Sequence, residues 1–214
     1  MKTEDLIEAL GRGPIAVDPK ALARRFGLMV GVGAVATLAL LLALLGPRPD
    51  LASAIAGPMF WMKLAIPAML AATALAASIQ LARPGGRAGL AWAAGALLLC
   101  AVEASAAISV ALAPGGERLA MVEGRTAWAC ITSIVLLSLP ILLATVLAMR
   151  GLAPTRLRAA GLAAGLVAGT LAATAYALHC DESTLPFFAV WYVLGMAIPG
   201  ALSALAGPRL LRWA

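Results

Sequence analysis

Charged residues and histidine are scarce in this chain. Charged residues make up 12% of its 214 residues and hydrophobic ones 63%, with a mean hydropathy of +0.97, whereas soluble domains carry roughly 25% charged residues. This balance excludes an ordinary soluble domain and indicates a polytopic membrane protein. The single histidine excludes most histidine-based hydrolytic schemes, and the sequence shows no phosphate-binding glycine loop and no zincin helix. We therefore expect a protein that is not an enzyme.

Six long apolar runs dominate the rest of the sequence. Each is about 20 residues or longer, enough for a helix to cross a hydrocarbon core of about 30 Å. They are rich in Ala and Leu and do not alternate between polar and apolar residues, which favours helices over strands. The sequence therefore predicts an all-α fold, a compact bundle of six transmembrane helices with short loops. The predicted spans, within a transmembrane domain of 26–206, are 26–45, 59–82, 89–112, 127–149, 158–178 and 186–206.

A polar leader, residues 1–25, precedes the spans, and residues 207–214 form a short tail. Within the leader, Thr3 can cap a short amphipathic helix over residues 4–10. Asp18-Pro19 has the pattern of an N-cap followed by the first helical residue, which predicts a second helix that runs directly into the first span. The leader has no apolar core, so we expect no cleavable signal peptide.

Basic residues are divided unevenly between the two sets of connections. Twelve of the sixteen lie in the leader, the second and fourth turns and the tail, whereas the opposite connections hold only Arg48, Arg118 and Arg125. Because short cytoplasmic loops carry the excess of Lys and Arg, both termini are predicted to be cytoplasmic. The turn His179–Glu182 then faces outward. The net charge of +6 reflects this topology, and we expect no direct contact with nucleic acid.

Small residues recur at helical spacing in two spans. Gly161, Gly165 and Gly169 share one face of the fifth span, and Gly27 and Gly31 share one face of the first. Such faces let helix backbones approach closely in a membrane. We expect them to pack within the bundle, with a dimer interface as the alternative. Prolines inside three spans are expected to kink their helices; they are Pro67, Pro140 and Pro199.

Aromatic residues concentrate near the helix ends that are predicted to face outward. Trp and Tyr are enriched where helices meet the membrane–water interface, because their rings are amphipathic. We therefore expect these residues to form an interfacial belt. They are Phe60, Trp61, Trp128, Phe187, Phe188, Trp191 and Tyr192.

Two of the three cysteines are predicted to lie near the outward face. Cys180 is in the outer turn, and Cys130 lies about 6 Å inside the fourth span at 1.5 Å per residue. Disulfides form and persist on an oxidising face, so these thiols are candidates for a redox or thiophilic-metal switch. A static disulfide or two inert small residues are the alternatives. Cys100 lies mid-span, where a cysteine is usually a small buried hydrophobe.

The tetrapeptide His179-Cys180-Asp181-Glu182 gathers the only histidine, a thiol and two carboxylates. The histidine can supply positive charge to the thiol, while the two carboxylates oppose a second anion. We expect these three neighbours to tune the thiol. Four consecutive residues cannot surround one ion, so a metal site would need Cys130 beside His179 and Cys180. As a metal motif by itself, the tetrapeptide is weak.

Lys63 and Glu103 are the charged residues that fall within predicted spans. Such charges are costly in a bilayer and usually face the bundle interior, often with a partner. Lys63 lies about one turn inside the outer end of the second span, where it can pair or extend to the surface. Glu103 is nearer the middle of the third span. An ion pair between them is plausible, and a small transporter or channel that uses both is the alternative function.

Several segments resemble the NrsF family of six-span bacterial inner-membrane proteins, which act as anti-sigma factors. The resemblance covers essentially the whole chain. It rests on the opening decapeptide Met1–Leu10, the six spans, Cys130, and the block His179-Cys180-Asp181-Glu182 with Pro186-Phe187, Trp191-Tyr192 and Gly195.

The resemblance implies that the protein holds an extracytoplasmic-function sigma factor at the inner membrane until a stress signal arrives. It further implies that the paired outer thiols, here Cys130 and Cys180, sense oxidant or heavy metal, with no resident cofactor. The predicted partners are that sigma factor and the lipid bilayer. The cytoplasmic contact is expected to use the basic turns and the leader residues Glu4, Asp5, Leu6, Ile7, Glu8 and Leu10.

A membrane thiol oxidoreductase is a third reading of the cysteines. Such enzymes normally use a Cys-x-x-Cys pair, and this sequence has none. Three cysteines are an odd number, so at most two of them can pair within one chain. We therefore place a regulatory membrane protein first.

Overall fold

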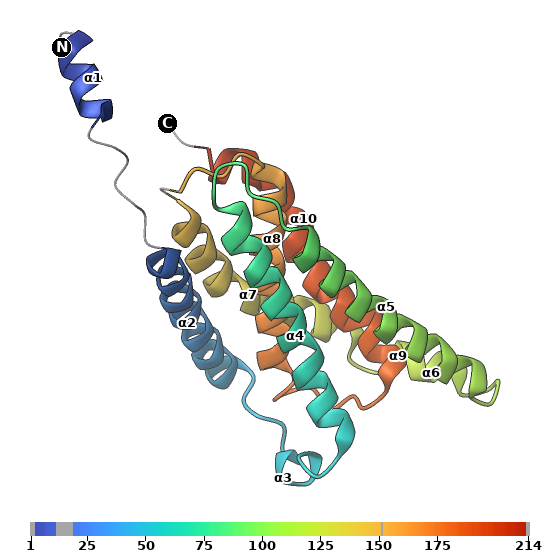
Figure 1. Cartoon of the computed structure of the whole chain (residues 1–214). Helices are drawn as coiled ribbons and strands as arrows, with labels where there is room; N and C mark the ends of the chain where they lie inside the picture. The colour runs from blue at the N-terminus through green and yellow to red at the C-terminus, as the bar shows by residue number, and fades with distance from the viewer. Residues whose placement is uncertain (1–2, 12–18, 151, 213–214) are drawn as a thin grey trace.

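The protein is a bundle of long helices, shown in Figure 1 as a computed structural model. The structure describes residues 3–11, 19–150 and 152–212. These described parts contain no strand, and six of their helices are long and apolar enough to cross a membrane. The prediction of an all-α bundle with six spanning helices is therefore confirmed.

Five of the six spans are single continuous helices. The sixth begins with a short helix and a π-helical segment before it becomes regular, and three further short helices lie outside the spans. The spans are α2 (Pro19–Leu44), α4 (Pro58–Leu81), α5 (Gly89–Leu112), α7 (Ala127–Met149), α8 (Leu157–Tyr176) and the combination of α9 (Leu185–Phe187), the π-helix η1 (Phe188–Tyr192) and α10 (Val193–Leu210). The short helices are α1 (Thr3–Gly11), α3 (Leu51–Ala54) and α6 (Arg118–Glu123).

Two helix ends lie beyond the predicted spans. Helix α2 begins at Pro19, so the second leader helix and the first span are one helix, as the Asp18-Pro19 pattern predicts. At the other end of the chain, α10 continues to Leu210, four residues past the predicted end at 206. It does so although Pro208 lies inside its last turn.

Antiparallel neighbours gather the connections at two opposite ends of the bundle (Figure 1). We call the end that carries residues 45–57, 113–126 and 177–184 the thiol end. The opposite end carries residues 82–88 and 152–156, together with the start of α2 and the end of α10, and we call it the basic end. The grouping agrees with the two sets of connections used in the charge count.

Helix α8 forms the centre of the bundle, because it packs against α10, α4 and α7 and buries twelve of its twenty residues. Its glycines permit close contact with α10. A Cβ atom added at Gly161 or Gly165 would collide with the backbone of Ser203 or Pro199, and one at Gly169 would lie 2.6 Å from Met196 O. The prediction that this glycine face packs inside the bundle is confirmed.

The second glycine face is not packed against the bundle. Gly27 and Gly31 have nothing within 4 Å of an added Cβ, whereas Gly33 lies against Ile141 and Pro140 of α7. One turn further, the buried hydroxyl of Thr37 donates a 2.9 Å hydrogen bond to Leu137 O. Proline at position 140 weakens the backbone hydrogen bonds just before it, and a hydroxyl from a neighbouring helix compensates.

The aromatic belt prediction is wrong for most of its residues. Trp61 and Trp128 are exposed, at 54% and 77%, as belt residues should be. The other five residues of the predicted belt are buried or half-buried, and three of them, Phe188, Trp191 and Tyr192, lie in the π-helix. Phe60, Phe187, Phe188 and Tyr192 are buried in the core, and Trp191 is half-buried and donates a hydrogen bond to Val122 O.

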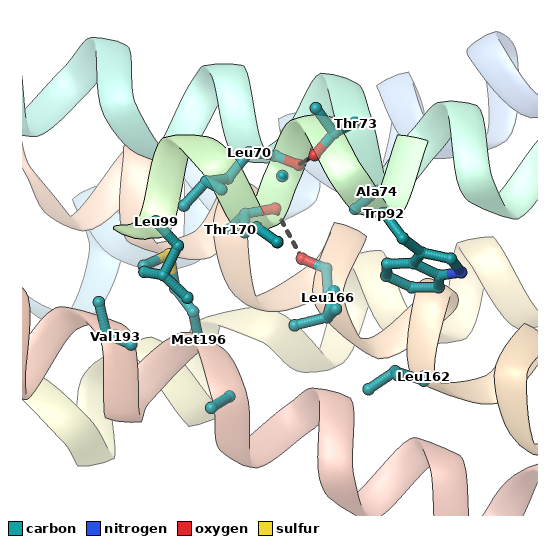
Figure 2. Close-up of a pocket in the computed structure, with 13 residues that line it drawn as sticks. Leu70, Thr73, Ala74, Trp92, Leu99, Leu162, Leu166, Thr170, Val193 and Met196 are labelled. Carbon is teal, nitrogen blue, oxygen red and sulfur yellow. Dashed lines mark hydrogen bonds between the residues drawn. The ribbon is translucent and has the colours of Figure 1, made fainter. Parts of the chain in front are cut away.

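A cavity of about 380 Å³ lies between α4, α5, α8 and α10 (Figure 2). Helix α5 leaves this space open because it is loosely held: only Ala91, Val102 and Ala106 of its 24 residues are buried. Neither Cys130 nor Cys180 lines the cavity, and its lining is almost entirely apolar side chains.

The close packing of α8 on α10 predicts that the loss of stability caused by replacing a glycine depends strongly on its position. We expect Gly165→Leu to destabilise the bundle by about 2 kcal/mol or more, because the side chain has no room beside Pro199 and Ser203. The matched control is Gly31→Leu, which meets open space. Thermal unfolding in detergent, followed by size-exclusion chromatography, measures both. Equal melting temperatures for the two variants would contradict this packing.

Candidate functional site

The thiols of Cys130 and Cys180 belong to one buried cluster at the thiol end. Cys130 lies in the first turn of α7 and is fully buried, and Cys180 follows the end of α8 and is 2% exposed. All three cysteines are free, and Cys100 is exposed on α5 instead of buried as the sequence suggested. The structure therefore brings together the two thiols that were singled out and sets the third apart.

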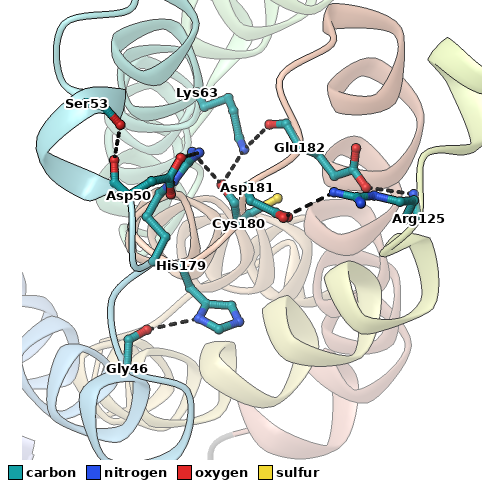
Figure 3. Close-up of polar contacts among 10 residues, drawn as sticks. Gly46, Asp50, Ser53, Lys63, Arg125, His179, Cys180, Asp181 and Glu182 are labelled. Atoms are coloured by element: carbon teal, nitrogen blue, oxygen red, sulfur yellow. Dashed lines mark hydrogen bonds and ion pairs between the residues drawn. The ribbon is translucent and has the colours of Figure 1, made fainter.

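The segment that carries Cys180 leaves α8 through a tight turn. The backbone N–H groups of His179 and Cys180 both donate to Tyr176 O, at 2.9 and 3.0 Å. Beyond this turn the chain crosses the thiol end in extended form until α9 begins at Leu185. We call residues 178–184 the cysteine loop. Its backbone carbonyls are therefore free to accept hydrogen bonds from other helices, and Figure 3 shows that several do.

Lys63 is the central donor to the cysteine loop (Figure 3). Its Nζ donates to Cys180 O at 3.0 Å and to Glu182 O at 2.7 Å. It also lies 5.3 Å from the ring centroid of Tyr192, a cation–π distance. The residue is only 3% exposed. A buried ammonium needs such partners, so the position of Lys63 on α4 and the path of the cysteine loop are fixed together.

Arg48 is a second cation that donates a hydrogen bond to the backbone carbonyl of Cys180. Its Nη1 donates to Cys180 O at 3.1 Å, and its backbone N–H donates to Leu178 O at 3.0 Å. The guanidinium is oriented by a bidentate contact with Asp50, at 2.6 and 2.7 Å. Hydrogen bonds from Arg48 hold the pKa of the Asp50 carboxyl below its usual value, so the pair stays ionised at neutral pH. The connection between α2 and α4 is thereby attached to the cysteine loop.

His179 is bound to the end of α2 and not to the thiol. Its Nδ1 lies 2.9 Å from Gly46 O, and because a carbonyl only accepts, Nδ1 carries the hydrogen. The ring also lies 5.7 Å from the ring of Tyr176. The structure therefore gives His179 a contact that ties the cysteine loop to the chain just after α2.

The two carboxylates contact the connection before α7. Glu182 Oε1 accepts from the backbone N–H of Arg125 at 2.7 Å and from the hydroxyl of Thr126 at 3.3 Å, where a negative charge suits a helix N-terminus. Asp181 lies 3.5 Å from the Arg125 guanidinium in an exposed pair, and Thr184 donates to Met121 O. The cysteine loop is thus attached to the start of α7 and to α6 as well.

The proposed metal ligands do not come together. Among the described residues, no three side chains of His, Cys, Asp or Glu are close enough to hold one metal ion. Cys130, His179 and Cys180 therefore form no preformed three-ligand site, because the imidazole of His179 faces Gly46. The side chains of His179, Asp181 and Glu182 contact Gly46 and Arg125. That they also tune the reactivity of the Cys180 thiol stays a prediction.

The two intramembrane charges do not meet either. In the described part of the chain no ion pair joins Lys63 to Glu103, because Lys63 is used by the cysteine loop. Glu103 lies on the exposed side of α5, where it lines a second cavity of about 380 Å³ with Arg118 and Ala189.

Sequence reasoning missed the partners of Lys63 and the role of Tyr192. Tyr192 is fully buried, its ring lies 4.9 Å from that of Phe188 and 5.9 Å from that of Tyr176, and within the described residues its hydroxyl has no oxygen or nitrogen hydrogen-bond partner. The residue lies in the π-helix, and π-helical turns are frequent at functional sites. The position of Lys63 one turn inside its span was the sequence feature that indicated a buried ammonium in need of partners.

The leader residues that were assigned to sigma binding lie in α1. Its acidic residues Glu4 and Asp5 are in the first turn, and Ile7 is 64% exposed. Glu8 is exposed as well. The side chains of Leu6 and Leu10 lie outside the described part of the structure.

Comparison with known proteins gives matches over the whole chain. A family model described as "Negative regulator of sigma F", NrsF, matches residues 10–213. A protein of Azospira oryzae named "Probable anti-sigma-F factor NrsF" is 44% identical over 213 residues, and one of Caulobacter vibrioides named "Anti-sigma-F factor NrsF" is 40% identical over 218 residues. Each alignment covers 100% of both chains. No solved structure matches.

The contacts of Lys63 predict how Cys180 is protected. We expect Lys63→Met to open the cysteine loop, because Glu182 O loses its buried donor and Cys180 O loses one of its two donors, at a cost of about 1–3 kcal/mol. Cys180 should then react with a water-soluble maleimide roughly tenfold faster, as measured by mass spectrometry of its peptide. The control, Arg125→Gln, removes an exposed pair of little energetic weight. Unchanged protection of Cys180 in Lys63→Met would refute this role.

Proposed function

This chain belongs to the NrsF family, and from that premise we propose that it is a membrane-bound anti-sigma factor with a thiol switch. In this proposal it holds an extracytoplasmic-function sigma factor at the cytoplasmic face of the bacterial inner membrane. It releases the sigma factor when Cys130 and Cys180 react with an oxidant or a thiophilic metal. The names of its relatives support the anti-sigma role, and the site supports the switch.

The observation that carries the switch is the shared burial of the two thiols beside a loop held by long-range contacts. Cys130 is fixed in a helix, whereas Cys180 lies in the cysteine loop, which polar contacts from three parts of the chain position. Moving Cys180 toward Cys130 therefore strains or breaks contacts to α2, α4 and α7 at once. A small local reaction is thereby transmitted to several helices.

The oxidative reaction is the formation of one disulfide. The two thiols lose two protons and two electrons, and their sulfur atoms join. The acceptor is a peroxide, which becomes water, or a disulfide donor, which becomes two thiols. A disulfide requires Cα atoms about 4.4–6.8 Å apart, so Cys180, the residue in the loop, is the one that adjusts. A soft metal ion that two thiolates bind would draw the same residues together.

The signal reaches the cytoplasm through helices that begin at the thiol end. The predicted sidedness places the thiol end outside and the basic end inside. Helix α8 ends at the cysteine loop and packs along α10 through its glycines, so displacement of the loop shifts this pair as a unit. The sigma factor must bind the two states with different affinity; a tenfold difference corresponds to about 1.4 kcal/mol.

The sigma-binding surface in this proposal is the basic end together with α1. Sigma factors are large soluble proteins, and α1 offers a short acidic and apolar helix with Ile7 exposed. The turns of the basic end add Arg83, Arg87 and Arg156, which are exposed. The proposed contact residues in α1 are Glu4, Asp5, Leu6, Ile7, Glu8 and Leu10.

Sensing is tested by replacing the thiols. We expect the Cys130→Ser/Cys180→Ser variant to retain the sigma factor in oxidant-treated cells, because no disulfide can form. The matched control, Cys100→Ser, changes the exposed cysteine and should release sigma as the wild type does. Sigma-dependent transcription and pull-down of sigma from solubilised membranes give the readout. Normal release by the double variant would exclude these thiols as the sensor.

Partner binding is tested separately. The full-length protein, purified from membranes of its native cells, should co-purify a sigma factor in reducing conditions. Ile7→Asp should weaken this association, because it places a charge on the exposed apolar position of α1. Purification without any sigma factor in reducing conditions would overturn the anti-sigma proposal, whatever the cysteines do.

A further inference from the structure

The cavity between α4, α5, α8 and α10 has the properties of a lipid-binding site. Its volume of about 380 Å³ lies within the range of small-molecule pockets. The hydroxyls of Thr73 and Thr170, which line it, already donate to backbone carbonyls of their own helices, at 2.8 and 2.6 Å. The cavity therefore presents no unpaired hydroxyl and suits an apolar occupant.

The depth of the cavity places it in the hydrocarbon layer. Leu70 lies about 18 Å along α4 from Pro58, and Leu162 lies about 8 Å along α8 from Leu157, at 1.5 Å per residue. The cavity thus runs from the middle of the bundle toward the basic end. Figure 2 shows Trp92 beside Leu162 at one extremity, and Val193 with Met196 at the other.

The cavity is open to the bilayer between α5 and α10. Ala96 of α5 and Ala197 of α10 line it and are exposed. Helix α5 packs mainly on α4 and buries few residues, so a chain-like molecule can enter sideways from the membrane. Water cannot fill an apolar space at this depth as favourably as hydrocarbon can.

A cation and an indole lie where the headgroup of such a lipid would be. Arg158 is four residues before Leu162 on α8, so it lies about one turn nearer the basic end than the cavity lining, where it lines a separate hollow with Arg156 and Pro208. Arg158 is exposed and can bind a phosphate. Trp92 lies in the first turn of α5, where indole rings favour the headgroup level.

We propose that this cavity binds one phospholipid from the leaflet at the basic end. One acyl chain lies between α5 and α10 and reaches Met196, and the phosphate lies against Arg158. Met196 also belongs to the buried cluster that holds Cys130 and Cys180, so the bound chain contacts the same core as the thiols. The site does not depend on the anti-sigma role.

Photo-crosslinking tests the site in the full-length protein. The probe is a phosphatidylglycerol with a diazirine in its acyl chain, incorporated with the protein into phospholipid nanodiscs. We expect crosslinks concentrated in the peptides that hold Ala96, Leu166 and Met196. Ala96→Trp, which fills the cavity, should remove them. The matched control is Leu97→Trp, because Leu97 is 74% exposed, lies about 100° further around the same helix and does not line the cavity, so its crosslinks should remain.

The headgroup contact is tested by Arg158→Gln with Arg156→Gln as its neighbouring control. We expect Arg158→Gln to lower the crosslink yield about fivefold, the effect of losing about 1 kcal/mol of attraction, and Arg156→Gln to leave it nearly unchanged. Crosslinks spread equally over the exposed face of α2 and the cavity peptides in the wild type would overturn the proposal without any variant. So would equal yields from Ala96→Trp and Leu97→Trp.

Discussion

The structure of the thiol end depends on one buried ammonium group. Lys63 lies on α4 inside an apolar bundle, and its charge is tolerated because two backbone carbonyls and an aromatic ring surround it. Those carbonyls belong to Cys180 and Glu182, so the loop that carries the thiol cannot move without leaving a buried charge unpaired. This constraint makes the loop well positioned and, at the same time, sensitive to any reaction that displaces Cys180.

Other contacts of the cysteine loop extend this constraint to the whole end of the bundle. Arg48 and His179 connect it to the segment after α2, and Glu182 connects it to the start of α7. On the other side, α8 leads from the loop to the basic end and is locked to α10 by glycines that leave no space for side chains. In the proposed switch, the spanning helices themselves link the two ends of the bundle.

The spanning helices could be predicted from the sequence, whereas the tertiary contacts of individual side chains could not. Residues 89–112 and 127–149 were predicted and found as helices, because length and hydropathy are local properties that the bilayer converts directly into spans. The two thiols that were predicted to lie at the same end of the bundle do share one buried cluster there, and their sidedness stays a prediction from the charges of short loops. The surroundings of the thiols were not predicted, because tertiary packing decides whether Tyr192 faces lipid or the core. Tyr192 lies in a π-helix, which has no clear sequence signal. The depth of Lys63 in its span indicated that it has a partner. Glu103, the partner suggested by its charge, faces outward. The ammonium group is instead hydrogen-bonded to backbone carbonyls far along the chain.

The central claim is that a change of state at Cys130 and Cys180 accompanies loss of the sigma factor. Differential alkylation of the thiols in intact cells, followed by mass spectrometry of the purified protein at successive times after oxidant, measures it most directly. The account predicts that a peptide pair linked through Cys130 and Cys180 accumulates in step with sigma release, while Cys100 remains free. Release of sigma with both thiols still reduced and unmodified would contradict it.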